Sequence, residues 1–264
     1  AGLKSEIEEP ASWVSIESFG GLGDGLTDNC NAFTSAAASF GGNAGVIFFP
    51  TGIYLFNQSI NIPDSVIVRG VSSDSTIFKF DLGGQNHAIK ILGSNTNDDA
   101  EFTSSANRGD NIIALDETSF LQARDFIQIS DEDDSLITSS WAEETTGQII
   151  QVDSISGQNV YLASKLRRDY NLINEPKIKE IQPARNVKIE KLKIQRMDAT
   201  SGQTSNIYIV RAFNCQISCI ESEDCNFGHV DVRSSTNIQI EGSYFHHAHA
   251  YGGGGQGYGA VLHS

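Results

Sequence analysis

The 264-residue sequence contains no run of about 18 apolar residues, so no segment is predicted to span a bilayer as a helix. It also has few basic residues: 18 lysines and arginines stand against 33 aspartates and glutamates, a formal net charge of -15. This charge repels nucleic acid and anionic membrane surfaces, and we expect neither as a partner. The length and the low charge content indicate a globular protein with one large all-β domain or two smaller units.

The sequence has only four cysteines, and their spacing gives no disulfide framework. Cys215 and Cys219 are expected on one strand, where a separation of about 13 Å exceeds the roughly 7 Å limit for a bridge. We therefore expect buried free thiols. The chain begins "AGLKSEIEEP", without Met or an apolar leader, as a processed secreted protein or a trimmed sequence does.

The segment Val14 to Phe56 predicts a strand, a Gly-rich turn, a short helix capped by Thr27 or Asp28, and a buried strand that ends at Pro50. The Gly-Asp-Gly turn lacks both a following Gly-Lys-Ser/Thr and the Gly-x-Gly-x-x-Gly spacing. No nucleotide site is expected here.

This segment, with "FGGLGDGLTDNCNAF" followed by a helix and "VIFFPTGIY", resembles the N-terminal cap of the pectate-lyase-like superfamily. The resemblance covers roughly Val14 to Leu55, and "IPDSVIVRGVSSDSTIFKF" continues as the first coils of that superfamily do. It implies an all-β fold: a right-handed parallel β-helix, or solenoid, with a short N-terminal cap helix.

Between about Asn95 and Pro183 the pattern changes to short alternating strands, "NIIALD", "DFIQIS", "GQIIQVDS" and "NVYLA", the last two joined by a hairpin signal at 155–158. Antiparallel hairpins do not belong inside a parallel coil, so this segment is expected to be an inserted antiparallel β subdomain. The predicted organisation is a cap and first coils at 1–93, the insert at 94–184, and further coils at 185–264. The last strand reaches Ser264 without a capping element, which predicts that the coils continue or that a second chain or another copy covers this end.

An internal repeat supports the coils. Asn-apolar-polar-Ile recurs at Asn186, Asn214 and Asn237, with spacings of 28 and 23 residues. One period corresponds to one coil, so the three asparagines are expected to form a ladder at a turn. Two inward columns are then expected: Val187, Cys215 and Ile238, and Ile189, Ile217 and Ile240.

A second strand can be aligned in each coil. Its expected inward residues are Ile207, Ile209, Val230, Val232, Gly259 and Val261. This alignment leaves Tyr208, Asp231 and Arg233 together in one outward surface patch.

The run "SYFHHAHAYGGGGQGYG", Ser243 to Gly259, is expected to be a loop that overhangs this patch. It resembles a segment of bacterial β-helix proteins of the same superfamily, in which "YFH" leads into a Tyr and poly-Gly run and then "GYG". The substrate-binding candidates are Tyr208, His246, His247, Tyr258, Gly253 and Gly254.

Three chemistries compete for the loop. A metal site is not assigned, because His246, His247 and His249 lack the i, i+4 helix spacing and nearby cysteines. A lyase needs a base, an acid and a group that neutralises the sugar carboxylate; His249 or Tyr251 and Arg233 supply these. A hydrolase needs two carboxylates, and Asp231 with Glu221, Glu223 or Asp224 supplies them.

Structural roles compete with these assignments. Asp231 and Arg233 can form a surface ion pair of little energetic value. Glu221 to Asp224 can be a solvated turn, Tyr244 and Phe245 can be packing residues, and His246 can hydrogen-bond backbone. The density of polar aromatics and glycine nevertheless favours ligand binding by the loop.

The resemblance implies a secreted or cell-surface enzyme that degrades or modifies a polysaccharide or oligosaccharide, with a lyase favoured over a glycoside hydrolase or epimerase. The alternative is a non-catalytic glycan-binding or structural β-helix, such as an adhesin or a tailspike-like protein. The net charge of -15 disfavours a polyuronate unless the basic strip between Lys165 and Arg196 or bound Ca2+ offsets it. Ca2+ is the one cofactor kept as a candidate, and a homo-oligomer is kept as a candidate assembly.

Overall fold

The computed structural model describes residues 7–84, 86–142, 146–251 and 255–263. The chain divides into two compact units. The first comprises the chain up to Leu92 with Ala184–Val232 and Asn237–Leu262, and the second is mainly Gly93–Pro183. Each unit has its own hydrophobic core. Among the described residues, no helix has the length and apolarity needed to cross a membrane.

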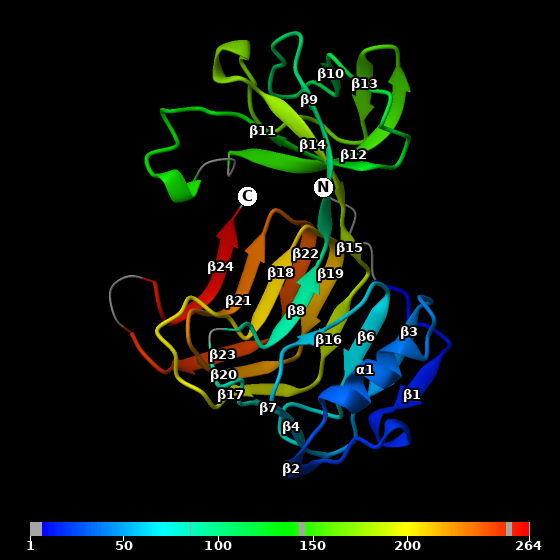
Figure 1. Ribbon diagram of the computed structural model, residues 1–264, viewed down its shortest axis with the longest axis vertical. Coiled ribbons are helices and arrows are strands. Elements are labelled where there is room, and N and C mark those ends of the chain that lie inside the picture. The colour runs from blue at the N-terminus through cyan, green and yellow to red at the C-terminus, as the bar shows by residue number, and fades with distance from the viewer. Residues whose placement is uncertain (1–6, 85, 143–145, 252–254, 264) are drawn as a thin grey trace. The chain divides into compact units, whose positions relative to one another are not determined.

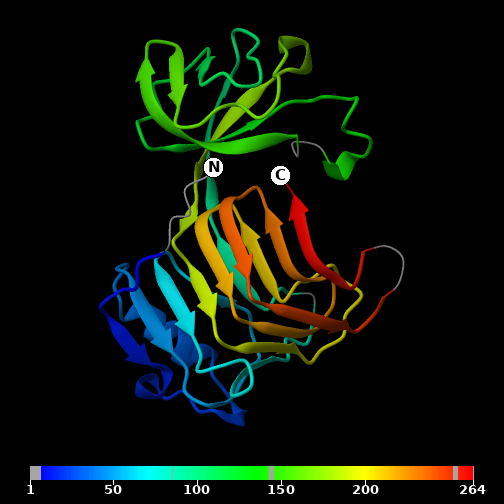
Figure 2. The same ribbon diagram turned by 180° about the vertical axis from the view of Figure 1, so that it is seen from behind.

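The first unit is a right-handed parallel β-helix, as the sequence predicts (Figures 1 and 2). Successive coils contribute strands to three parallel sheets. The first sheet runs β1 (Trp13–Ser15), β3 (Gly45–Phe48), β6 (Val66–Arg69), β16 (Lys188–Glu190), β19 (Ala212–Ser218) and β15 (Ala184–Arg185), and β22 (Thr236–Glu241) also pairs with β19. The second runs β2 (Asp24–Asp28), β4 (Gly52–Phe56), β7 (Thr76–Phe80), β17 (Lys193–Arg196), β20 (Glu221–Cys225) and β23 (Tyr244–Ala248). The third runs β5 (Ile60–Asn61), β8 (Ile89–Leu92), β18 (Ile207–Val210), β21 (Gly228–Arg233) and β24 (Tyr258–His263).

The asparagine repeat forms the first corner of the coils. Asn186, Asn214 and Asn237 all have a φ of 56°, in the left-handed region that asparagine tolerates better than most residues. The side-chain amide of Asn214 donates to Oδ1 of Asn186 at 2.7 Å, and that of Asn237 donates to Oδ1 of Asn214 at 2.9 Å. The predicted ladder is confirmed.

Two more corners repeat the left-handed conformation. Lys191, Cys219 and Gly242, each five residues after a ladder asparagine, have φ values of 57°, 53° and 57°. Asp224 and His247, each ten residues after a ladder asparagine, have φ values of 57° and 58°. The chain therefore turns at corresponding positions in neighbouring coils, which keeps the strands between the corners in register.

The inward columns form the core of the β-helix. Ile189 pairs with Val68 on one side and with Ile217 on the other, and Val187 and Cys215 are also buried. The prediction holds in part for the next coil, where Ile238 and Ile240 are half-buried and pack against the same core.

The thiols depart from expectation at one position. All four cysteines are free, as predicted, and Cys30, Cys215 and Cys225 are buried. The expectation of a buried thiol is wrong for Cys219, which is exposed at the second corner.

The cap helix α1 (Cys30–Ala38) follows a short 3-10 helix, η1 (Ile16–Phe19), and strand β2. The structure corrects the predicted cap: the helix begins after Asn29, while Oδ1 of Asp28 accepts a hydrogen bond from the amide of Cys30 at 3.1 Å. The side chain of Asn29 instead accepts a hydrogen bond from the amide of Leu22 at 2.8 Å and so holds the Gly-rich turn.

The second unit is an antiparallel β subdomain inserted into the chain, with two short 3-10 helices, η2 (Ser140–Ala142) and η3 (Leu172–Asn174). Its first and last strands are neighbours, and Ser94 pairs with Gln182, so the insert enters and leaves at one point. The sheet order is β10 (Ile112–Ala114), β13 (Asn159–Leu162), β12 (Gly147–Ser156), β11 (Phe126–Ser130), β14 (Lys177–Gln182) and β9 (Ser94–Glu101).

Candidate functional site

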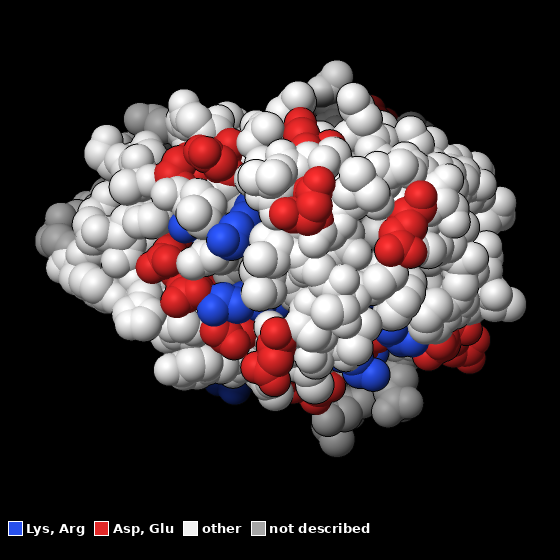
Figure 3. Space-filling view, turned by 90° about the horizontal axis from the view of Figure 1, so that it is seen from below, with Lys and Arg blue, Asp and Glu red and all other residues white. Residues whose placement is uncertain are grey.

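The outer face of the second sheet carries two rows of polar side chains over three successive coils. Lys193 on β17, Glu221 on β20 and Tyr244 on β23 are register partners and form the first row. Gln195, Glu223 and His246 form the second row in the same way. Figure 3 looks onto this side of the molecule, where basic and acidic side chains alternate over part of the surface.

An ionic group lies at the centre of these rows. The ammonium nitrogen of Lys193 is 2.8 Å from Oε1 of Glu221 and 2.6 Å from Oε2 of Glu223. The two carboxylates lie on one face of β20 because residues two apart on a strand project to the same side. Since both contact the same nitrogen, the two oxygen atoms lie close to each other.

Two histidines extend this ionic group. Nε2 of His246 is 2.9 Å from Oε1 of Glu221, and its Nδ1 is 2.8 Å from Nδ1 of His247. Consecutive residues of a regular strand face opposite sides, but the left-handed conformation of His247 brings its ring beside that of His246. We call Lys193, Glu221, Glu223, His246 and His247 the outer cluster.

The ion pairs shift the pKa values within the outer cluster. Burial opposes the charged form of Glu221, but hydrogen bonds from Lys193 and His246 outweigh it and lower the pKa of the Glu221 carboxyl. Burial likewise opposes the charge on Lys193, while hydrogen bonds to Glu221 and Glu223 raise the pKa of its ammonium group. At neutral pH the site therefore contains an ionised carboxylate and a cation.

An aromatic surface adjoins the outer cluster. Tyr244 is 64% exposed, and its ring stacks on that of His246 with a centroid distance of 4.5 Å. Tyr244 therefore packs at the surface, against His246, and not in the core. Its neighbour Phe245 is half-buried and packs against the core, as expected.

A buried polar chain lies on the opposite side of β20. The hydroxyl of Ser222 lies 2.9 Å from Nδ1 of His229 and accepts a hydrogen bond from the side-chain amide of Asn206 at 3.0 Å. Burial is the main cause that lowers the pKa of His229 to about 4, so its imidazole is neutral at pH 7. The ring of His229 also stacks on Phe245, which ties this interior layer to β23.

Four predicted site residues lie on the third sheet. Tyr208 on β18 is half-buried and stacks on His87 with a centroid distance of 3.7 Å. Asp231 on β21 is fully buried, so the predicted open surface patch does not include it, while Arg233 is half-buried. Tyr258 on β24 is 46% exposed and packs edge-on against Phe227.

The predicted loop residues lie after β23. Nε2 of His249 is 3.1 Å from the backbone carbonyl oxygen of Arg196, and the hydroxyl of Tyr251 accepts a hydrogen bond from the amide of Ala248 at 2.8 Å. Gly253 and Gly254 lie outside the described residues. The structure thus brings His246 and His247 together with Glu221 and Glu223 on the second sheet, whereas Tyr208, Asp231, Arg233 and Tyr258 belong to the third.

Sequence analysis missed the association of Lys193 with this site, although a signal was present. Lys193, Glu221 and Tyr244 each follow a ladder asparagine by seven residues, and Gln195, Glu223 and His246 follow by nine. Extending the asparagine repeat along each coil would have predicted both rows.

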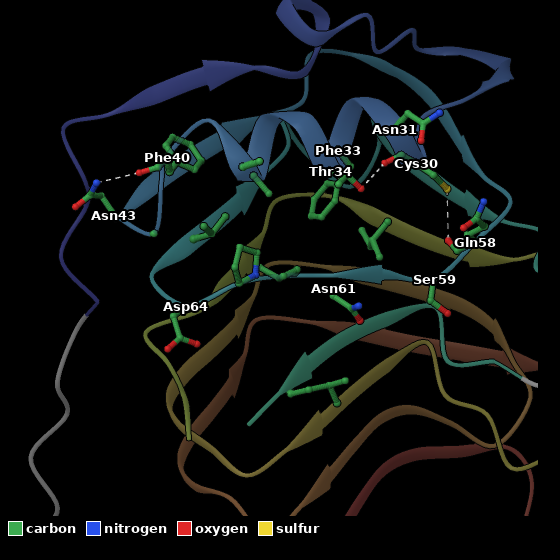
Figure 4. A pocket seen from close by; sticks show the side chains of 18 residues that line it. Cys30, Asn31, Phe33, Thr34, Phe40, Asn43, Gln58, Ser59, Asn61 and Asp64 are labelled. Carbon is green, nitrogen blue, oxygen red and sulfur yellow. Dashed lines mark hydrogen bonds between the residues drawn. The ribbon is translucent and has the colours of Figure 1, made fainter. Parts of the chain in front are cut away.

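A separate cavity of about 630 Å³ lies beside the cap helix (Figure 4). It is lined by residues of α1 and of the segment around β5, and several of its polar groups already bond within the lining. Oγ1 of Thr34 donates to the carbonyl of Cys30, and the side-chain amide of Asn43 donates to the carbonyl of Phe40. Asp64 is the one ionisable carboxylate among the lining residues, so the cavity offers no acid-base pair.

The fold and the polar outer face define a pectate lyase-like parallel β-helix protein. The model of the rhamnogalacturonase A/epimerase, pectate lyase-like family matches residues 13–259, and the chain belongs to that family. A pre-neck appendage protein of Bacillus phage B103 is 33% identical over 67 residues, which are 25% of this chain and 7% of that protein.

Three solved phage tailspikes have a similar fold. Tailspike gp49 of Pseudomonas phage LKA1 has a TM-score of 0.71 and 19% identity, and the match covers 94% of this chain and 44% of the tailspike chain. Tailspike gp61 of Pseudomonas phage phi297 has a TM-score of 0.74 and 13% identity, covering 95% and 45%. The Gp54 tailspike of Acinetobacter baumannii bacteriophage AP22, solved in complex with A. baumannii capsular saccharide, has a TM-score of 0.57 and 16% identity, covering 89% and 46%. This chain spans less than half the length of each of these proteins, and the likeness concerns the fold.

Proposed function

We propose that this chain binds and cleaves a polysaccharide on the outer face of β17, β20 and β23. One observation carries the proposal: three successive coils place an exposed aromatic ring, two carboxylates and a cation side by side on one face. Membership of the rhamnogalacturonase A/epimerase family and the saccharide complex of the AP22 tailspike support a glycan as the ligand. A protein with this activity works outside the cell, on a cell surface or on a virus particle.

The carboxylate pair favours hydrolysis over elimination. Glycoside hydrolysis uses two carboxyl groups, which lie about 5 to 5.5 Å apart in the retaining mechanism. Glu221 and Glu223 share one lysine partner, so their close spacing suits the retaining type, and Glu221 with its lowered pKa suits the ionised member. A lyase centred on His249, Tyr251 and Arg233 has less support, because His249 and Tyr251 contact backbone groups. Tyr244 supplies an apolar ring face on which a sugar ring can pack.

A panel of acidic and neutral polysaccharides tests the proposal. Hydrolysis releases reducing ends without unsaturated products, whereas a lyase generates both. Glu221→Gln and Glu223→Gln are each expected to reduce the rate by about 10²-fold or more, as loss of an acid-base group does. Glu241→Gln, on the exposed end of β22, is the matched control and should retain the wild-type rate. Equal rates in all three variants would remove the outer cluster from the reaction.

A non-catalytic glycan-binding role is the second candidate. Lys193 holds both carboxylates in ion pairs, which suits binding of sugar hydroxyls as well as catalysis. Saccharide binding measured by calorimetry, without product release from any polysaccharide of the panel, would favour this role.

A further inference from the structure

The outer cluster contains a group of three side chains that could bind a metal ion: Glu223, His246 and His247. Their ligand atoms all lie within 4.8 Å of one another, and they come from two adjacent coils, β20 and β23. Sequence analysis assigned no metal ligands, since the three histidines lack the usual motif spacing. The left-handed corner at His247 is what brings two consecutive imidazoles to the same side of the strand.

The hydrogen bonds of His246 leave one of its nitrogens available as a ligand. Nε2 lies 2.9 Å from Oε1 of Glu221, and an ionised carboxylate can only accept, so Nε2 carries the proton. Nδ1 of His246 then presents its lone pair, toward Nδ1 of His247 at 2.8 Å. Metal-binding histidines are commonly oriented by a carboxylate on their second nitrogen in this way, with Glu221 in that role here.

The distances are close to those of a coordination sphere. Metal bonds of about 2.0 to 2.1 Å place neighbouring tetrahedral ligand atoms roughly 3.3 Å apart. The two Nδ1 atoms are 2.8 Å apart, and Oε1 of Glu223 is 3.7 Å from Nδ1 of His247. The ligand atoms of Glu223 and His246 lie within 4.8 Å of each other, so side-chain movements of up to about 1.5 Å bring the three atoms to the required spacing.

The local charge also favours a dication. Glu221 and Glu223 contribute two negative charges and Lys193 one positive charge, so the outer cluster is negative when both imidazoles are neutral. Lys193 contacts Oε2 of Glu223, which leaves Oε1 to face the histidines. His247 is 67% exposed, so an ion can enter from solvent and keep a water ligand.

We propose that Glu223, His246 and His247 form an open, three-ligand binding site for a divalent transition-metal cation such as Zn2+, linking two successive coils. Two imidazoles and one carboxylate suit Zn2+, Co2+ or Ni2+, whereas Ca2+ and Mg2+ favour oxygen ligands. Binding requires the neutral His247 ring to change tautomer, so that its proton moves from Nδ1 to Nε2, and the metal replaces the hydrogen bond between the two rings. This site does not depend on the proposed glycan function.

Calorimetric titration of the untagged chain with Zn2+ alone tests the proposal. We expect one ion per chain, and at least a tenfold loss of affinity in both His246→Ala and His247→Asn. Asparagine is chosen at 247 because it tolerates the left-handed backbone. His249→Ala is the control, since this nearby histidine contacts the carbonyl of Arg196 and is not part of the site.

Co2+ provides a second measurement. A visible absorption band of four- or five-coordinate Co2+ should appear in the wild type and be absent from His247→Asn, with circular dichroism showing that both proteins are folded. Millimolar Ca2+ should not displace the ion. Binding of less than half an ion per chain at 100-fold excess Zn2+, or equal loss in His249→Ala, would overturn the proposal. Either result leaves the polysaccharide assay unaffected.

Discussion

Cys219 differs from the other three cysteines in its exposure at a coil corner. Burial raises the pKa of Cys30 to about 11 and the pKa values of Cys215 and Cys225 to about 12, so these thiols stay protonated as well as inaccessible. We predict that a maleimide labels one thiol per native chain, and that Cys219→Ser abolishes the labelling. Mass spectrometry counts the adducts; a second rapidly labelled cysteine would contradict the burial of the other three.

We predict that Asp198 makes the free energy of unfolding decrease at acidic pH. It pairs with the fully buried Arg196, at 2.5 Å from Oδ1 to Nε and 3.0 Å from Oδ2 to Nη2. Burial opposes the charge of Asp198, but the hydrogen bonds from Arg196 outweigh it and lower the pKa of the carboxyl below its ordinary value. The unfolded chain therefore binds the proton first, and this contribution is present above about pH 4 and is lost as the pH falls further.

Asp198→Asn tests this dependence. The variant should lose about 3 to 5 kcal/mol of unfolding free energy at pH 7, because it leaves the buried charge of Arg196 without a countercharge. The loss should shrink at pH 3. Urea unfolding at both pH values measures it, with the exposed Asp74→Asn as the control. An equal loss at the two pH values would show that ionisation of Asp198 is not the cause.

Some properties of single residues followed from sequence, and others did not. The burial of Val187 and Ile217 followed from alternation, because a coil has one apolar interior. Asp231 was expected at the surface and is fully buried, because alternation predicts the side of the strand and not the exposure of the side chain. The contact of His246 with Glu221 depends on the register between coils, which a pattern within one strand does not contain.

The corner ladder allows a prediction for the strands that it connects. Asn214 is bonded to the asparagine on each side and has a φ of 56°. Asn214→Ala should cost about 2 to 4 kcal/mol, since it loses two hydrogen bonds and places alanine, which tolerates the left-handed region less well than asparagine, at this corner. Asn214→Gly loses the same hydrogen bonds, but glycine adopts the left-handed conformation without strain, so this variant should cost about half as much. Chemical denaturation compares the two; equal losses would assign the whole effect to the hydrogen bonds.

The elements themselves were largely predictable. The cap strand and helix, the coils and the hairpin of the insert all have short-range signals: a capping segment, alternation and a Gly turn. Left-handed corners at Lys191 and Cys219 were not predicted, because neither residue type favours that conformation and the stacking of neighbouring coils imposes it.

The insert is predicted to be separable from the β-helix. Its terminal strands pair at Ser94 and Gln182, and its core consists of its own residues. Replacing residues 94–182 by a short Gly-Ser link should leave the parallel coils folded, and residues 94–182 alone should also fold. Thermal unfolding and amide dispersion in NMR spectra measure both. Loss of cooperative unfolding in the shortened chain, together with a folded wild type, would show that the coils need the insert.

The constant offsets between corners have a consequence for comparing related sequences. The first two corners are five residues apart in each of the three coils, whereas ten residues separate β17 from β18 and only two separate β20 from β21. Gaps in an alignment of coils therefore belong after the second strand and nowhere between the first corner and that strand. A search profile anchored on the asparagine, with fixed columns seven and nine residues later, would align the polar rows of distant homologues even where overall identity is too low to place them.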